Sequence, residues 1–169
     1  GISGVWSCTE KNDPEKNPGK VDSAGVLIIW RDDMWEIEGV GATPNDCARQ
    51  HLPGRVVSVV LKSTKDGTQL QLTGYYFFQK NKTRAIQERC STAVYEACDE
   101  LADNMAHLVT GDANGAVPCK VQGKPEPNDE FVADMMDGRD YTRLGILAPT
   151  NFFGKKKNEK ANWGRTKEK

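Results

Sequence analysis

Residues 83–109 read TRAIQERCSTAVYEACDELADNMAHLV, and apolar side chains recur along them every three or four residues. This spacing places the apolar side chains on one side of an α-helix. They are Ile86, Cys90, Val94, Ala97, Leu101, Met105 and Leu108. No Gly or Pro interrupts the pattern, and Gly111 follows it as a helix-stop residue. We therefore predict one long amphipathic helix over residues 83–109.

The chain before this helix has the features of β-strands. Apolar and β-branched residues are concentrated in short segments, and the Asp66-Gly67 pair supplies a tight turn between the last two. About five strands are expected, at residues 2–9, 21–31, 34–40, 55–62 and 69–79. Because they follow one another without helices between them, we predict an antiparallel meander and not β-α-β units.

The second of these strands is apolar on both faces. Val26, Ile28 and Trp30 share one face, and Leu27 and Ile29 share the other. A strand with apolar side chains on both faces is typical of one that is covered on two sides. We therefore expect both of its faces to be buried.

Together these patterns predict an α+β fold in which the meander sheet packs against the helix at 83–109. A short second helix is expected over residues 129–137, with Asn128 as its cap and Gly138 as its end. Residues 1–153 are predicted to form a single domain, a size that one hydrophobic core can support. Residues 154–169 are predicted to be an irregular, basic C-terminal tail. No apolar run approaches the ~18 residues of a transmembrane helix.

The five cysteines, Cys8, Cys47, Cys90, Cys98 and Cys119, contain no C-x-x-C pair, which argues against a zinc ribbon or a thioredoxin-like site. Cys90 and Cys98 would lie about 12 Å apart along the helix, too far to bond to each other. Cys98–Cys119 is the shortest closure, and the other three would share one further disulfide and one free thiol. This pattern favours an exported protein, in the periplasm or an organelle lumen. The alternative is five reduced, buried thiols.

The formal net charge of −1 is divided unevenly. Residues 154–169 hold seven Lys or Arg against two Glu, a balance of +5, so residues 1–153 carry −6. A basic, aromatic tail on an acidic body suggests docking on an acidic protein surface or lipid headgroups, and the alternative is a solvated terminus. The candidate docking residues are Phe152, Phe153, Lys155, Lys156, Lys157, Trp163 and Arg165. Specific nucleic-acid binding is not expected, because a tail alone binds weakly and without sequence preference.

Catalytic and cofactor motifs are absent from the sequence. It contains no P-loop, G-x-G-x-x-G, G-x-S-x-G or H-E-x-x-H. Cys47 and His51 could form half of a metal site or a Cys–His nucleophile, but His107 is the only other histidine and no orienting group is visible. We therefore predict no catalytic, cofactor-binding or metal-binding residues and no cofactor.

Gly4-Val5-Trp6 resembles the G-x-W motif that opens lipocalin-type barrels. In that family the Trp closes one end of a ligand-binding barrel of eight strands. Only about five strands are expected here before the helix, so Trp6 is more simply a side chain packed on a sheet.

The sequence favours a non-catalytic accessory or binding subunit that docks on a larger protein assembly, partly through its C-terminal segment. One alternative is a small-ligand-binding barrel or small hydrolase, which requires a cavity with converging polar groups between sheet and helix. Another alternative is an inhibitor or immunity-type protein, which would use the same scaffold.

Overall fold

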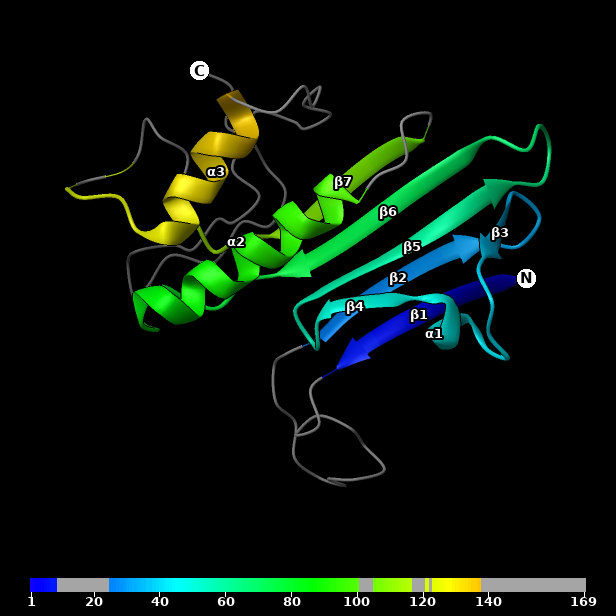
Figure 1. Cartoon of the computed structure of the whole chain (residues 1–169), viewed down its shortest axis with the longest axis horizontal. Helices are drawn as coiled ribbons and strands as arrows, with labels where there is room; N and C mark the ends of the chain where they lie inside the picture. Colours follow the sequence, from blue (N-terminus) through cyan, green and yellow to red (C-terminus); the bar gives the residue numbers. More distant parts are fainter. Residues whose placement is uncertain (9–24, 101–104, 117–120, 122, 138–169) are drawn as a thin grey trace, which may run out of the picture.

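The structure is a computed structural model, and it describes residues 1–8, 25–100, 105–116, 121 and 123–137 (Figure 1). Within these ranges the chain forms seven strands and three helices. They are β1 (Ile2–Cys8), β2 (Gly25–Arg31), β3 (Trp35–Glu38), α1 (Pro44–Cys47), β4 (Arg49–Leu52), β5 (Val56–Ser63), β6 (Gln69–Tyr76), α2 (Arg84–Asp99), β7 (Ala106–Asp112) and α3 (Pro127–Asp137). None of these helices is both long enough and apolar enough to span a membrane.

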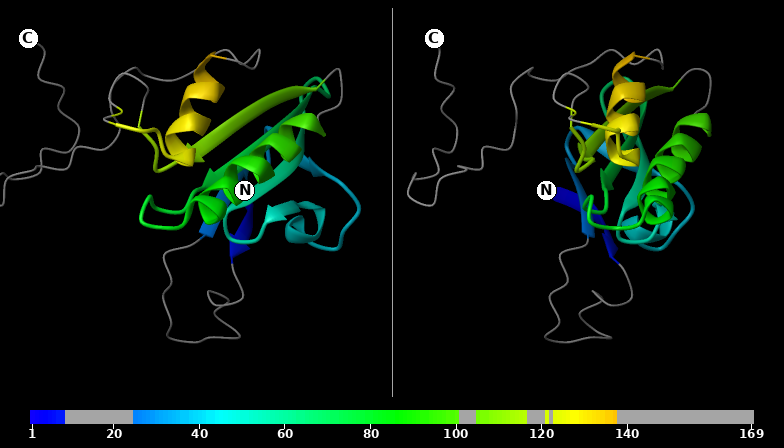
Figure 2. Two further views of the ribbon diagram at one scale, coloured as in Figure 1. Left: turned by 60° about the vertical axis from the view of Figure 1, so that its left-hand side comes forward. Right: turned by 90° about the vertical axis from the view of Figure 1, so that its left-hand side faces the viewer.

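The described elements form three layers, and the predicted α+β class is confirmed. The β1–β2 hairpin lies on one side of a five-stranded sheet, and α2 and α3 lie on the other side (Figure 2). The sheet has the order β3-β5-β6-β7, and β4 pairs with β5 beside β3. All of its pairs are antiparallel except β6–β7, which is parallel.

The core between the hairpin and the sheet follows from strand alternation. Alternate residues of a strand point to opposite faces, so Val57, Val59 and Leu61 of β5 face the hairpin. They pack against buried residues of β1 and β2, namely Val5, Val26, Ile28 and Trp30. On β6, Gly74 leaves room for this contact, because a Cβ there would lie 2.7 Å from Val26 Cγ1. β2 therefore lies directly over β6.

The core on the helix side is largely aromatic. Phe77, which follows β6, and Phe131 of α3 are almost fully buried, with ring centroids 4.6 Å apart. Cys90 and Val94 of α2 pack in the same cluster with no exposed surface. The apolar stripe that predicted the helix is therefore the surface that α2 buries.

The predicted helix over residues 83–109 is too long. α2 ends at Asp99, and Leu108 lies in β7, which begins at Ala106. β7 pairs with β6 over seven residues, beginning with Leu70 and Ala106. The helical spacing continued into this segment by coincidence, and the hydrogen bonds to β6 decide its conformation.

The predicted single antiparallel meander is also wrong in two respects. β1 and β2 form a separate two-stranded sheet, and β6, α2 and β7 form a β-α-β unit. Two parallel strands need a crossover connection, and α2 supplies it. The sequence pattern did not reveal this because the last strand read as helix.

The predicted short helix at 129–137 is confirmed as α3, but Asn128 does not cap it. α3 begins at Pro127, and Asn128 lies inside it, fully buried. Its Nδ2 donates to the carbonyl oxygen of Phe78 at 2.8 Å. Asn128 therefore ties α3 to the end of the sheet.

The predicted second disulfide does not form. Cys8, Cys47 and Cys90 carry free thiols, and no two cysteines of the described ranges are joined. The five-stranded sheet separates Cys8 in the hairpin layer from Cys90 in the helix layer. The predicted Cys98–Cys119 bridge involves Cys119, which lies outside the described residues, as do the tail 154–169 and the docking residues predicted from Phe152 onward.

Candidate functional site

Polar side chains form a row on the helix-facing side of the sheet. Ser58 of β5 lies directly opposite Thr73 of β6 in the strand register. The chain's two histidines flank this pair, His51 from β4 and His107 from β7. We call His51, Ser58, Thr73 and His107 the polar seam.

The polar seam consists of two hydrogen-bonded pairs. His51 Nε2 lies 2.7 Å from Ser58 Oγ, and His107 Nε2 lies 2.8 Å from Thr73 Oγ1. Ser58 is 5% exposed and Thr73 fully buried, so both hydroxyl groups depend on these partners. The seam therefore satisfies two buried hydroxyl groups, one on the largely apolar strand β5 and one on β6.

A β-bulge brings His51 into the seam. Gln50 pairs with Val57 and Leu52 with Val56, so His51 is the extra residue between them. A bulge redirects side chains, and here it places both His51 and Leu52 on the helix side.

A carboxylate lies near the His51 ring, on the side away from Ser58 and beyond hydrogen-bond distance. Glu100, which follows α2, places Oε2 3.9 Å from His51 Nδ1, and its Oε1 accepts a hydrogen bond from Arg49 at 2.5 Å. His51 Nε2, on the other side of the ring, faces Ser58. This order of groups is the one found in serine hydrolases.

Burial keeps both histidines neutral near pH 7. It lowers the pKa of His51 despite the opposing attraction of Glu100. It also lowers the pKa of His107 to about 4, with a further contribution from the charge of His51. A neutral imidazole can accept a proton, which a general base requires.

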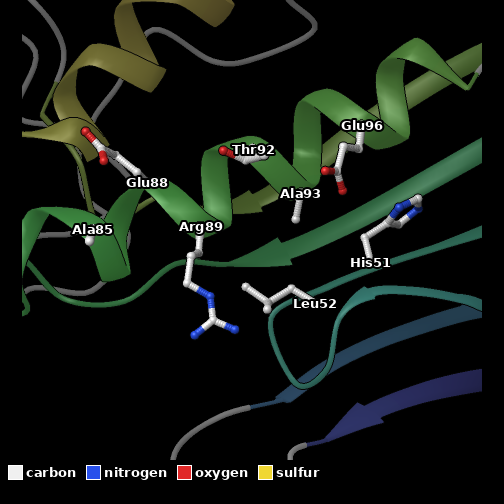
Figure 3. Close-up of a pocket in the computed structure, with 8 residues that line it drawn as sticks. All are labelled: His51, Leu52, Ala85, Glu88, Arg89, Thr92, Ala93 and Glu96. Carbon is white, nitrogen blue, oxygen red and sulfur yellow. The ribbon is translucent and has the colours of Figure 1, made fainter.

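Two cavities adjoin the polar seam. The smaller, about 230 Å³, is bordered by Ser58, Arg49, Glu100, Gln71 and Cys47 among others. The larger, about 370 Å³, lies between α2 and the β4 segment (Figure 3). There the side chains of His51 and Glu96 point toward one another. Polar side chains therefore line both cavities.

Cys47 and His51 do not act together in this arrangement. Cys47 borders the smaller cavity, whereas the His51 ring bonds to Ser58. Across the described parts of the chain, no cluster of three or more His, Cys, Asp or Glu is placed to hold a metal ion.

A second feature is the outer face of the β1–β2 hairpin. Ile2, Trp6, Leu27 and Ile29 point away from the sheet and are 74%, 45%, 57% and 61% exposed. We call these four residues the hairpin face. The expectation that β2 is covered on both sides is therefore wrong within the described chain. Trp6 lies on this open face beside Gly25 and does not close a barrel.

Comparison with protein-family models, with curated proteins and with solved structures finds no match.

Sequence reasoning missed most of the polar seam. Ser58 interrupts the Val-rich strand β5, which was the available signal, whereas Thr73 only continues the polar alternation of Gln69 and Gln71. The pairing of the two hydroxyl groups with His51 and His107 depends on the strand register and on β7, which the helical pattern concealed.

Proposed function

We propose that this chain is a non-catalytic binding subunit of a larger protein assembly and that the hairpin face is its principal docking surface. The observation that carries this proposal is the exposure of the four apolar side chains of that face. They expose on the order of 500 Å² of apolar surface, near the upper end for the largest patch on a monomeric protein. Water contact with such a patch is unfavourable, and a partner would remove it.

The composition of the face supports the same role. Trp6 lies opposite Leu27 in the strand register, so an aromatic group forms part of the patch. Aromatic side chains are enriched among the residues that dominate binding energy at interfaces. Arg31 and Asp33 form an exposed ion pair at 2.5 Å beside the face, which provides a polar rim.

Docking through the C-terminal tail, on protein or on an anionic surface, stays a prediction, and so does the exported location. The free thiols of Cys8, Cys47 and Cys90 remove part of the argument for an oxidising compartment. A mass comparison of the intact chain before and after reduction counts any remaining disulfide.

The double variant Leu27→Ser/Ile29→Ser is expected to leave the assembly while remaining folded. Both side chains are exposed, so the free energy of unfolding should change by less than about 1 kcal/mol. In size-exclusion chromatography of extracts from source cells, the wild-type chain should elute in a larger complex and the variant near 18.7 kDa.

Val40→Ser is the matched control, because Val40 is fully exposed and lies outside the hairpin face. It should elute with the wild type. Deletion of residues 154–169, studied in parallel, measures how much the C-terminal tail contributes to assembly. A wild-type chain that elutes as a monomer, or a double variant that stays in the complex, would contradict the proposal.

A second function is favoured by one specific observation, the spatial arrangement of Ser58, His51 and Glu100 beside a cavity. The cavity of about 230 Å³ would admit only a small acyl ester. In such a reaction Ser58 Oγ would attack the ester carbonyl and His51 would take the Ser58 proton and pass it to the leaving alcohol. Water would then release the acid by the same route.

Hydrolysis of p-nitrophenyl acetate tests this second function. If it is correct, Ser58→Ala should lower kcat/KM by at least about 10³-fold and abolish labelling by a fluorophosphonate. Thr73→Val removes the equivalent hydroxyl from the neighbouring strand and should retain both. A wild-type rate equal to that of Ser58→Ala would exclude the hydrolase.

A further inference from the structure

We infer that the partner docks by adding an extended segment as a third strand along the open edge of β2, beside the hairpin face. The inference rests on the proposed function and specifies the conformation and chemistry of the partner. It follows from the direction of the β2 backbone groups, from the different widths of the two sheets and from the area of the hairpin face.

The backbone of β2 presents unpaired groups on the side away from β1. Asp32 N donates to Gly1 O at 3.1 Å, so these two residues form a hydrogen-bonded pair. Hydrogen-bonded and non-hydrogen-bonded pairs alternate along an antiparallel ladder, which makes the Leu27 and Ile29 pairs non-hydrogen-bonded. Trp6, opposite Leu27, agrees: its N–H points outward and donates to Asn45 Oδ1 at 2.9 Å.

The amide and carbonyl groups of Leu27 and Ile29 therefore point to the open edge. Within the described chain they have no hydrogen-bond partner. The opposite edge, on β1, differs because Asn45 of α1 covers part of it. Unpaired backbone groups on an apolar strand are the usual template for strand addition.

Past the open edge of β2, the five-stranded sheet extends one strand further than the β1–β2 hairpin. β2 lies over β6, and β7 lies beyond β6. The side chains of β7 that alternate toward the hairpin side, Ala106, Leu108 and Thr110, are exposed. A cavity of about 440 Å³ is lined by β2, β6 and β7 at this position. Neighbouring strands lie about 4.8 Å apart, so the exposed strand β7 gives room for one added strand.

The area of the hairpin face argues against a second copy of this chain as the occupant. The ~500 Å² that the face offers falls below the roughly 800 Å² that each partner buries in a standard interface. Pairing two copies through their β2 edges would also bring β7 of the second copy toward the space beside β2 of the first copy. A partner strand adds backbone hydrogen bonds and buries Leu108 as well.

The chemistry of the groove defines the partner segment. It should be about five to seven residues long, the usual length of a strand. Its inward side chains would contact Leu72 and Leu108, so Val, Ile or Leu is expected at alternate positions. Pro is excluded at positions that bond to Leu27 or Ile29, because it lacks the amide donor.

The test selects binders for the full-length chain from a display library of random short peptides. Selected peptides should carry Val, Ile or Leu at alternate positions. Amide hydrogen exchange of the chain is then compared with and without the best peptide. Exchange at Leu27 and Ile29 should slow by about tenfold or more, whereas Val26 and Ile28, whose amides already point to β1, should change little.

Two variants separate this inference from the proposed function. Leu108→Asp, beneath the added strand, should weaken peptide binding at least about tenfold, and Val40→Asp should not. One outcome is that Leu27→Ser/Ile29→Ser loses peptide binding, but the peptide gives no protection to the Leu27 and Ile29 amides of the wild-type chain. In that case the docking face stands and strand addition is overturned. If no peptide is selected, or binding survives in the double variant, strand addition is overturned and the docking face loses its support.

The isolated chain distinguishes the other occupants of the edge. Slow exchange at Leu27 and Ile29 without peptide, independent of concentration, would assign the edge to a segment of this chain. Slow exchange that appears only at high concentration, together with a dimer mass, would assign it to a second copy. Either result overturns a separate partner.

Discussion

Replacing Asp129 by Asn is expected to lower the free energy of unfolding by about 3 kcal/mol, because a buried carboxylate loses its charge and part of its bonding. Asp129 is only 3% exposed. It accepts hydrogen bonds from Lys80 Nζ at 2.5 Å, from Ala116 N at 2.6 Å and from Glu126 N at 3.2 Å. In the variant, Lys80 loses its counter-charge and one backbone donor faces an amide NH₂ group.

The pKa of Asp129 reflects this bonding. Burial alone would raise it, but the hydrogen bonds, led by that of Lys80, outweigh burial and keep it below the usual value. The carboxylate is therefore charged at neutral pH, and it joins α3 to the segments around Lys80 and Ala116.

Urea denaturation at pH 7 measures the effect, with Glu130→Gln as the matched control. Glu130 also accepts from a cation, Arg84 at 2.7 Å, but both side chains are about half exposed. Exposed ion pairs contribute little, so the control should lose less than about 1 kcal/mol. Equal losses in the two variants would show that Asp129 is not a buried anchor.

Acidification is expected to destabilise the chain through His107. Its pKa is about 4 in the folded protein, against 6.5 for an unperturbed side chain. Between these values the unfolded state binds the proton and the folded state does not, so stability falls as pH decreases from 6.5 to 4. The full difference corresponds to about 3 kcal/mol. Above pH 6.5 this contribution is constant.

Thermal or urea unfolding of wild type and His107→Gln, followed from pH 7 to pH 4, isolates this effect. Carboxylates titrate in both proteins, so the difference between the two curves belongs mainly to His107. The wild type should lose more stability than the variant by about 2–3 kcal/mol. Parallel curves would mean that the His107 ring is not held neutral by burial.

The parts of the fold that depend on local pattern could be predicted from the sequence. The hairpin turn at Asp66-Gly67 and the stripe through Cys90 and Val94 depend on residues close together in the chain, and both appear in the structure. The end of the helix could not be predicted, because β7 is stabilised by pairing with β6, more than 30 residues earlier in the chain.

The candidate sites were harder to predict for the same reason. His51, Ser58 and Glu100 lie on three elements, and only the bulge in β4 and the end of α2 bring them together. The hairpin face misled the prediction in another way. Leu27 and Ile29 are apolar, and a sequence cannot show whether the surface that covers such residues belongs to the same chain or to a partner.

Hydroxyl-radical footprinting of the native assembly and of the isolated chain tests the docking face most directly. In the isolated chain Trp6 should be oxidised readily, since it is 45% exposed, whereas Trp30, at 7%, should be protected in both samples. In the assembly, oxidation of Trp6, Leu27 and Ile29 should fall by about fivefold or more. Equal oxidation of these three residues in both samples would show that the hairpin face stays in water, and the proposed docking function would be wrong.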